Sequence, residues 1–263
     1  MDLFEDRDDR RKSKKDRDRE IQMAMVKNMN KIEENNDDFF EAIDWGSIDI
    51  AAGDADRWKD FPAVKKDFYI ESESTKKLTN TEISEWRAKN FDIDAKQIFK
   101  NESDRKNEVE SIPKPCLSFE DAFKHYPEIL DTIKKQKFTT PSPIQSQFWP
   151  CVLSGLDTIG IAQTGTGKTL AFLLPMFIHI DGQKTTRKDR KGPTALILSP
   201  TRELAIQIEQ EIKKYTYKGI KCTCVYGGAD SRSQIKAVQA GAEIVVATPG
   251  RFNDLVAQEI MTS

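Results

Sequence analysis

Residues 162–169 read AQTGTGKT, which matches the spacing of a loop that binds nucleotide phosphates, with alanine in place of the leading glycine. The two glycines allow the backbone to curl so that successive N–H groups face phosphate oxygens, and the helix expected to follow adds a positive N-terminal end. Lysine at this place reaches the β and γ phosphates, and threonine offers a hydroxyl to Mg²⁺. The predicted nucleotide-binding residues are Ala162, Gln163, Thr164, Gly165, Thr166, Gly167, Lys168 and Thr169. Among them Lys168 and Thr169 are the predicted catalytic residues, and Thr169 is the predicted Mg²⁺ ligand.

Two further loops carry a threonine and an arginine where a helix is expected to begin. Thr201 and Thr248 can each cap a helix, and Arg202 and Arg251 add positive charge beside the free N–H groups. Two such helix starts would suit consecutive phosphates of one nucleic-acid strand. Ordinary helix capping is the alternative at Thr201. Between these loops lies the pair Gly227 and Gly228, which permits either close approach of another backbone or a simple turn.

These loops must be positioned by a scaffold, and from residue 116 onward the sequence predicts an α/β fold. Short apolar segments predict strands at DTIGI, TALILS, KCTCVY and EIVVA, each followed by a loop and a helical pattern. Helices are also expected at PEILDTIKKQ and, with Ser142 as its cap, at SPIQSQFWPCVLSG. Alternating strands and helices favour a mostly parallel sheet, in which ligands bind at the carboxyl ends of the strands. The four loops are therefore expected to share one edge.

The N-terminal part has a different composition. Residues 1–37 are predicted to be a disordered charged tail, since the first 20 residues hold eight acidic and eight basic side chains and almost no apolar ones. Its RRKSKK sequence could be a nuclear localisation signal or part of a solvated tail. Residues 38–115 are predicted to be an extension with one helix near residues 80–90. Its isolated aromatics could anchor it across the folded domain or bind another partner. Residues 116–263 are the predicted folded domain.

Charge and cysteine content narrow the possible functions. A net charge of −2 excludes a uniformly basic nucleic-acid binder, so contacts with a polyanion must be local. The four cysteines include no CxxC pair, and Cys222 and Cys224 are expected to be buried strand residues in a reducing compartment. The longest apolar run is 11 residues and contains a proline, which is too short to span a membrane. We expect an intracellular monomer, nuclear or cytoplasmic.

Taken in order, these motifs resemble those of the DEAD-box RNA helicases, with the KH-containing type closest. FTTPSPIQ is similar to the Q motif, AQTGTGKT to motif I, PTRELA to motif Ia, the glycine pair to the GG motif and TPGR to motif Ib. The resemblance covers about residues 55–260 and implies a RecA-like phosphate-loop domain with ATP-dependent RNA helicase activity. It also implies ATP and Mg²⁺ as cofactors and RNA as the partner.

The family's residue roles transfer to matching positions. Gln145 would hydrogen-bond the adenine edge through its amide, and Phe119 would stack on the adenine ring. Contacts with the sugar-phosphate backbone of single-stranded RNA, independent of base sequence, would come from Thr201, Arg202, Gly228, Thr248 and Arg251.

Two departures from the family pattern have consequences. Lys137 stands where the family usually has glycine, and a positive φ there would cost about 1 kcal/mol or more. Neither Asp-Glu-Ala-Asp nor Ser-Ala-Thr occurs in the sequence, and a second RecA-like domain is absent from it. Hydrolysis by these residues alone is therefore expected to be nearly abolished. The segment DTIGI should lose its neighbouring strands, so the chain is expected to be unstable or prone to aggregate.

Two other functions remain possible from the sequence. A small-molecule kinase would also use a phosphate loop, but it does not explain why FTTPSPIQ, PTRELA and TPGR occur together. The chain could also be a truncated product that binds RNA or a partner without catalysis.

Overall fold

The computed structural model describes residues 63–97, 112–185, 189–190, 192–215, 217–258 and 260. The chain divides into two units, Met1–Phe61 and Pro62–Ser263, and the described residues all belong to the second. The predicted charged tail and the first part of the predicted extension lie outside the described residues.

The elements follow one another as helices first and then as alternating strands and helices. In chain order they are α3 (Glu73–Lys77), α4 (Asn80–Lys89), α5 (Phe119–Phe123), α6 (Pro127–Lys135), α7 (Pro143–Leu153), α8 (Lys168–Asp181), β1 (Ala195–Leu198), α9 (Arg202–Lys213), β2 (Cys222–Val225), α10 (Ser231–Gln239), β3 (Ile244–Ala247) and α11 (Pro249–Ala257). The helices expected near residues 80–90, at PEILDTIKKQ and at SPIQSQFWPCVLSG are thus confirmed as α4, α6 and α7.

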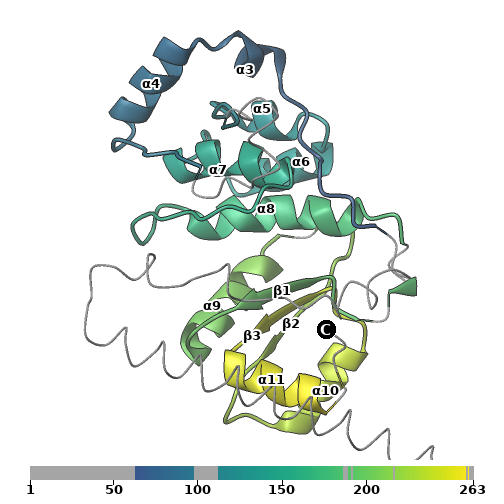
Figure 1. Cartoon of the computed structure of the whole chain (residues 1–263). Coiled ribbons are helices and arrows are strands. Elements are labelled where there is room, and N and C mark those ends of the chain that lie inside the picture. Colours follow the sequence, from purple (N-terminus) through teal and green to yellow (C-terminus); the bar gives the residue numbers. More distant parts are fainter. Residues whose placement is uncertain are drawn as a thin grey trace, which may run out of the picture. The chain divides into compact units, whose positions relative to one another are not determined.

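The three strands form one parallel sheet in the order β1-β3-β2, with every residue of β3 buried (Figure 1). Leu198 at the end of β1 and Val225 at the end of β2 both lie opposite Ala247 at the end of β3. The carboxyl ends of the strands are therefore level. This register confirms the predicted parallel α/β sheet and brings the loops after these three strands to one edge.

The predicted strand at residues 157–161 is wrong: this segment has no regular secondary structure. Ile159 is 57% exposed and Ile161 is 85% exposed, so the apolar side chains that suggested a buried strand have no cover. A strand needs hydrogen-bonded neighbours, and none of the described strands pairs with this segment. The segment that leads into the phosphate loop is therefore irregular, with exposed apolar side chains.

Helices α7 and α8 pack against each other and carry the largest side chains of the core (Figure 1). Trp149 of α7 is fully buried, contacts Phe123 edge-on at 4.7 Å between ring centroids, and donates its indole N–H to the carbonyl of Leu170 at 3.3 Å. An aromatic side chain of this size contributes much of the burial in a small core. The first turns of α7 and α8, which carry the predicted nucleotide-binding residues, are therefore held by one core.

The extension packs against the ends of α7 and α8. Phe68 is 7% exposed, its ring meets His179 edge-on at 4.8 Å, and its N–H donates to the carbonyl of Leu153 at 2.7 Å. Gly182 makes this possible, since a Cβ there would lie 2.0 Å from the Phe68 ring. Tyr69 adds a hydroxyl contact of 3.5 Å with the Cys116 sulfur. For residues 63–71 the structure therefore agrees with the interpretation that aromatics anchor the extension on the domain.

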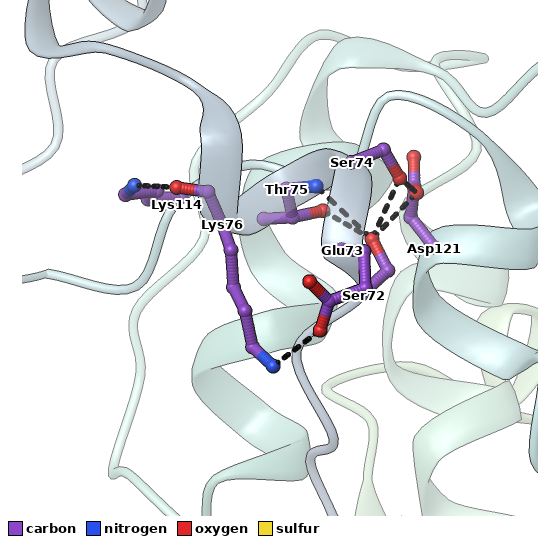
Figure 2. A network of polar contacts seen from close by, with 7 residues as sticks. All are labelled: Ser72, Glu73, Ser74, Thr75, Lys76, Lys114 and Asp121. Carbon is purple, nitrogen blue, oxygen red and sulfur yellow. Dashed lines mark hydrogen bonds and ion pairs between the residues drawn. The ribbon is translucent and has the colours of Figure 1, made fainter.

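Helix α3 is held by a cluster of hydroxyls around one carboxylate (Figure 2). Asp121 accepts hydrogen bonds from Ser72 Oγ at 2.7 Å and from Ser74 Oγ, and from both the N–H and the hydroxyl of Ser118 at 2.9 Å. Burial alone would raise the pKa of Asp121, but the hydrogen bonds from Ser74, Ser72 and Ser118 outweigh it and lower the pKa. Asp121 therefore caps α5 and anchors α3 with one side chain.

Lys137 has a φ of 60°, so the positive φ suspected at this position is confirmed. A lysine with this φ has a steric cost of about 1 kcal/mol that a glycine would not have. Position 137 ends the turn between α6 and the sequence that leads into α7.

Candidate functional site

The phosphate loop curls as its glycines predict. Gly165 and Gly167 have φ values of 80° and 85°, and α8 begins at Lys168 directly after Gly167. A Cβ at Gly165 would meet nothing within 4 Å, so the space in front of this residue is open. The Lys168 ammonium donates to the carbonyl of Ala162 within the same loop. The loop thus presents backbone donors, a helix N-terminus and a lysine at one place, which suits a chain of phosphates.

Gln145 joins this loop to the first turn of α7. The side chain is 6% exposed; its Nε2 donates to the carbonyl of Gly167 at 3.1 Å, and its Oε1 accepts from the N–H of Ser142 at 2.9 Å. A Cβ at Gly167 would lie 2.5 Å from Nε2, so this contact requires glycine. The predicted adenine-binding residue and the predicted phosphate loop are therefore in direct contact.

The Gln145 amide keeps capacity for a ligand. An amide oxygen has two acceptor sites and an amide nitrogen two hydrogens, and the protein uses one of each here. The Ser142 hydroxyl beside it is buried and has no hydrogen-bond partner among the described residues. A Cβ at Gly167 would lie 3.3 Å from this oxygen, so the unsatisfied hydroxyl also faces the loop. These groups fit a nucleotide, because a purine edge and a phosphate chain need the donors and acceptors left over.

Phe119 is placed differently from what stacking on a ligand requires. Its side chain is buried and packs against Trp149, with 5.8 Å between the ring centroids. Phe119 and Phe123 lie on one face of α5, and both contribute to the core. Stacking of Phe119 on adenine stays a prediction, and it would need the ring to expose one face.

The predicted RNA-binding residues after β1 and β2 come together. Thr201 caps α9 and accepts from the N–H of Leu204 at 3.3 Å, which confirms its capping role. The Arg202 guanidinium lies 5.7 Å from the centroid of the Tyr226 ring. A Cβ at Gly228, where φ is 80°, would lie 3.8 Å from an Arg202 nitrogen. The exposed Arg202, which also forms an ion pair with Glu203 at 3.6 Å, thus lies beside the glycine turn at one corner of the edge.

The residues after β3 are tied to α10. Thr248 is the N-cap residue of α11, as predicted, but its side chain makes no capping hydrogen bond. Its N–H donates to the carbonyl of Val225 at 3.1 Å. The Arg251 side chain is only 10% exposed, since its Nε donates to Gln234 Oε1 at 3.3 Å and an Nη donates to the Ser231 hydroxyl. The structure therefore shows Arg251 held within the fold, and its contact with RNA stays a prediction.

Gln234 connects the loop after β2 with the helix start after β3, and the sequence analysis did not identify this residue. Its side chain is buried, accepts from the N–H of Tyr226 at 3.3 Å and donates to the carbonyl of Tyr226 at 3.1 Å, while it also accepts from Arg251. Tyr226 in turn lies under Arg202. Gln234 is one of several polar residues in the helical pattern SRSQIKAVQ, so the sequence gives no signal of this role. Its contacts lie 8 and 17 residues away in the chain.

Metal-ligand clusters and reactive thiols were sought in the described part of the chain. It contains no group of three or more His, Cys, Asp or Glu residues arranged to hold a metal ion. Burial raises the pKa of the Cys222 thiol to about 12 and that of the Cys224 thiol to about 11, so neither is a reactive thiolate at neutral pH. None of the helices in the described ranges has the length and hydrophobicity needed to cross a bilayer.

Comparison with known proteins finds similarity to the DEAD-box helicases. Residues 142–262 match the family model of the DEAD/DEAH box helicases. The probable ATP-dependent RNA helicase DDX43 of Homo sapiens is 46% identical over 215 residues, which are 81% of this chain and 32% of the relative. The DEAD-box ATP-dependent RNA helicase 30 of Arabidopsis thaliana is 43% identical over 194 residues, covering 73% of this chain and 30% of the relative. The chain spans about a third of the length of these relatives.

A solved structure supports the fold. The yeast DEAD-box splicing factor Prp28 matches with a TM-score of 0.58 and 25% identity, covering 71% of this chain and 42% of that one. The RecA-like α/β fold class predicted from the sequence is confirmed by this likeness together with the parallel sheet.

Proposed function

Because the chain belongs, through residues 142–262, to the DEAD/DEAH box helicase family, we propose that it binds ATP with Mg²⁺ and the backbone of single-stranded RNA as part of an ATP-dependent RNA helicase. The observation that carries this proposal is the 3.1 Å hydrogen bond from Gln145 Nε2 to the Gly167 carbonyl. It joins a residue suited to a purine edge to a loop suited to phosphates, at a spacing that one nucleotide can bridge.

The donor hydrogen and the acceptor site of Gln145 that make no hydrogen bond within the protein favour adenine over guanine. The free hydrogen on Nε2 can donate to N7 of either purine. The free acceptor site on Oε1 can accept from the N6 amino group of adenine, whereas guanine presents the O6 acceptor there and repels it. The hydrogen bonds with Ser142 and Gly167 fix the positions of Oε1 and Nε2, so the amide cannot flip. The preference for adenine is therefore built into the protein before the nucleotide binds.

The phosphate loop supplies the positive charge and the backbone donors that the nucleotide phosphates need. Lys168 would exchange its contact with the Ala162 carbonyl for the β and γ phosphates, and Thr169 would direct its hydroxyl at Mg²⁺. When bound, Mg²⁺ neutralises charge on the phosphate oxygens. The backbone donors of residues 163–167 and the N-terminus of α8 hold the remaining oxygens.

RNA would bind along the edge formed by the loops after the three strands. Arg202, Gly228 and Thr201 offer a guanidinium, an unobstructed backbone and a capped helix start within one corner. Thr248 and Arg251 would extend the contact at the next helix start. These groups recognise phosphates and sugars, so binding should be independent of base sequence.

The 263 residues alone are proposed to bind nucleotide without turning it over efficiently. Asp-Glu-Ala-Asp does not occur in them, and the side chains of Thr166 and Lys168 donate to backbone carbonyls of the phosphate loop itself. A water molecule beside the γ phosphate would then lack the acidic groups that orient it.

The proposal is tested by measuring binding of a non-hydrolysable ATP analogue and of single-stranded RNA to the purified chain. Lys168→Ala should weaken nucleotide binding by about thirtyfold or more, because it removes a hydrogen bond from a charged group. Arg202→Ala should weaken binding of oligo-U and oligo-A RNA alike and reduce the salt dependence by about one counterion. Nucleotide binding that is indifferent to Lys168→Ala would refute the assignment of the loop.

A further inference from the structure

Helix α7 is held from two sides. Gln145 and Gln147 lie two residues apart on it, so their side chains leave the helix in different directions. Gln145 bonds the phosphate loop at Gly167, while Gln147 bonds Arg87 of α4 in the extension. The helix that carries the proposed adenine-binding residue therefore lies between the nucleotide loop and the extension.

The contact between Arg87 and Gln147 is specific in geometry. Gln147 Oε1 accepts from Arg87 Nε at 3.0 Å and from Nη2 at 2.9 Å, and Gln147 Nε2 donates to the carbonyl of Pro113 at 2.9 Å. The Gln147 side chain is 8% exposed, so water cannot easily replace the arginine. A guanidinium fork that meets one oxygen through two N–H groups fixes direction as well as distance.

Backbone contacts hold α7 along its length. Pro150 has no N–H, so the carbonyl of Ser146, four residues earlier, lacks its usual partner within the helix. That carbonyl accepts instead from the N–H of Cys116 at 2.9 Å. At the end of the helix the carbonyl of Leu153 accepts from the N–H of Phe68 at 2.7 Å. These two bonds limit sliding of α7 along its axis, and the Arg87 contact limits its rotation.

We infer that Arg87 is a positioning residue for adenine recognition: by holding Gln147 it fixes the rotation of α7 and so aims the remaining donor and acceptor of Gln145. The inference rests on the proposed function, in which Gln145 contacts adenine. Hydrogen bonds weaken steeply when their angles change, so a small rotation of α7 would weaken the adenine contacts. Phosphate binding rests on Lys168 and on the backbone donors of residues 162–169, so it should depend less on this rotation than adenine binding does.

The test is the preference for adenine over guanine in the full 263-residue chain, measured as the ratio of the Kd for GDP to the Kd for ADP, each with Mg²⁺. Arg87→Met keeps an unbranched apolar stem and removes the guanidinium donors. It should lower the ratio by about fivefold, because ADP binding weakens more than GDP binding. Gln145→Ala should bring the ratio close to one. Ser74→Ala removes a different anchor of the extension, to Asp121, and should leave the ratio unchanged.

A double-mutant cycle separates positioning of α7 through Gln147 from a general loss of stability of the domain. Arg87→Met should have no further effect on the ratio in a Gln147→Leu background, since Arg87 acts through Gln147. Gln147→Leu alone should lower the ratio by the same factor as Arg87→Met, which also tests the inference if Arg87→Met does not fold.

The outcomes distinguish a failure of the Arg87 inference from a failure of the proposed role of Gln145. A wild-type ratio near one would overturn both the inference and the assignment of Gln145. A wild-type preference that Gln145→Ala erases and Arg87→Met leaves intact would overturn the inference alone, as would an equal loss in Ser74→Ala or additive losses in the cycle.

Discussion

The extension should contribute directly to the stability of the domain, and Phe68 is the residue that tests this most sharply. Its ring is 7% exposed, sits on Gly182 and meets His179 edge-on. Truncation of a buried phenylalanine costs about 3–5 kcal/mol in free energy of unfolding, from lost burial and from the cavity left behind. Because this ring packs at the end of α8 and not in the centre of the core, we expect Phe68→Ala to cost about 3 kcal/mol.

Phe91 provides a matched control in the same extension. It is 90% exposed, so Phe91→Ala removes the same atoms without losing burial and should change the free energy of unfolding by less than about 0.5 kcal/mol. The assay is equilibrium urea unfolding followed by circular dichroism, with limited proteolysis of the extension as a second measure. Phe68→Ala should also expose residues 63–71 to protease under native conditions, whereas Phe91→Ala should not.

A specific result would refute the reasoning. Equal stability of Phe68→Ala and Phe91→Ala, with equal protection of the extension, would mean that the extension does not rest on the domain in solution. In that case its aromatics would be free to bind another partner, which is the alternative that the sequence left open.

Three further predictions follow from local geometry. Asp121→Asn should destabilise the chain by about 1–2 kcal/mol at pH 7, because it replaces one carboxylate oxygen by an NH2 group and so leaves either Ser72 and Ser74 or Ser118 without an acceptor. The folded-state pKa of Asp121 is lowered, so this stabilisation is present above the ordinary pKa of an aspartate and is lost as the pH falls through the folded value. The unfolding curves of the two proteins should therefore converge in acid. Lys137→Gly should raise the free energy of unfolding by about 0.5–1 kcal/mol in the same assay, because φ is 60° there. Gly167→Ala should reduce ATP-analogue affinity in a binding titration by more than a Thr166→Ala control, since its Cβ would lie 2.5 Å from Gln145 Nε2.

Local patterns predicted much of this structure. The glycine spacing of the phosphate loop, the proline at the start of α7 and the apolar runs of β1, β2 and β3 each depend on a few consecutive residues, and all appear as expected. The doubt about Lys137 was likewise local, since it concerned one φ angle. Such features follow from backbone sterics and from the period of the hydrophobic pattern.

What the sequence could not predict depends on residues far apart in the chain. Residues 157–161 have the composition of a strand, but a strand also needs neighbours, and the pattern cannot report whether they are present. The contact of Arg87 with Gln147 spans 60 residues, and no local signal marks either residue as half of a pair. Phe119 was assigned to a ligand by resemblance, which stays a prediction, and no local pattern indicated that its ring packs on Trp149.

The account depends most directly on adenine recognition by Gln145 beside the phosphate loop. The decisive measurement is competition of MgATP and MgGTP for one bound fluorescent nucleotide on the wild-type chain and on Gln145→Ala. We predict a preference for ATP of about tenfold, as expected for one matched against one repelled hydrogen bond, and loss of the preference in Gln145→Ala. Equal affinity for the two nucleotides in the wild-type chain, or a preference that survives Gln145→Ala, would contradict the account.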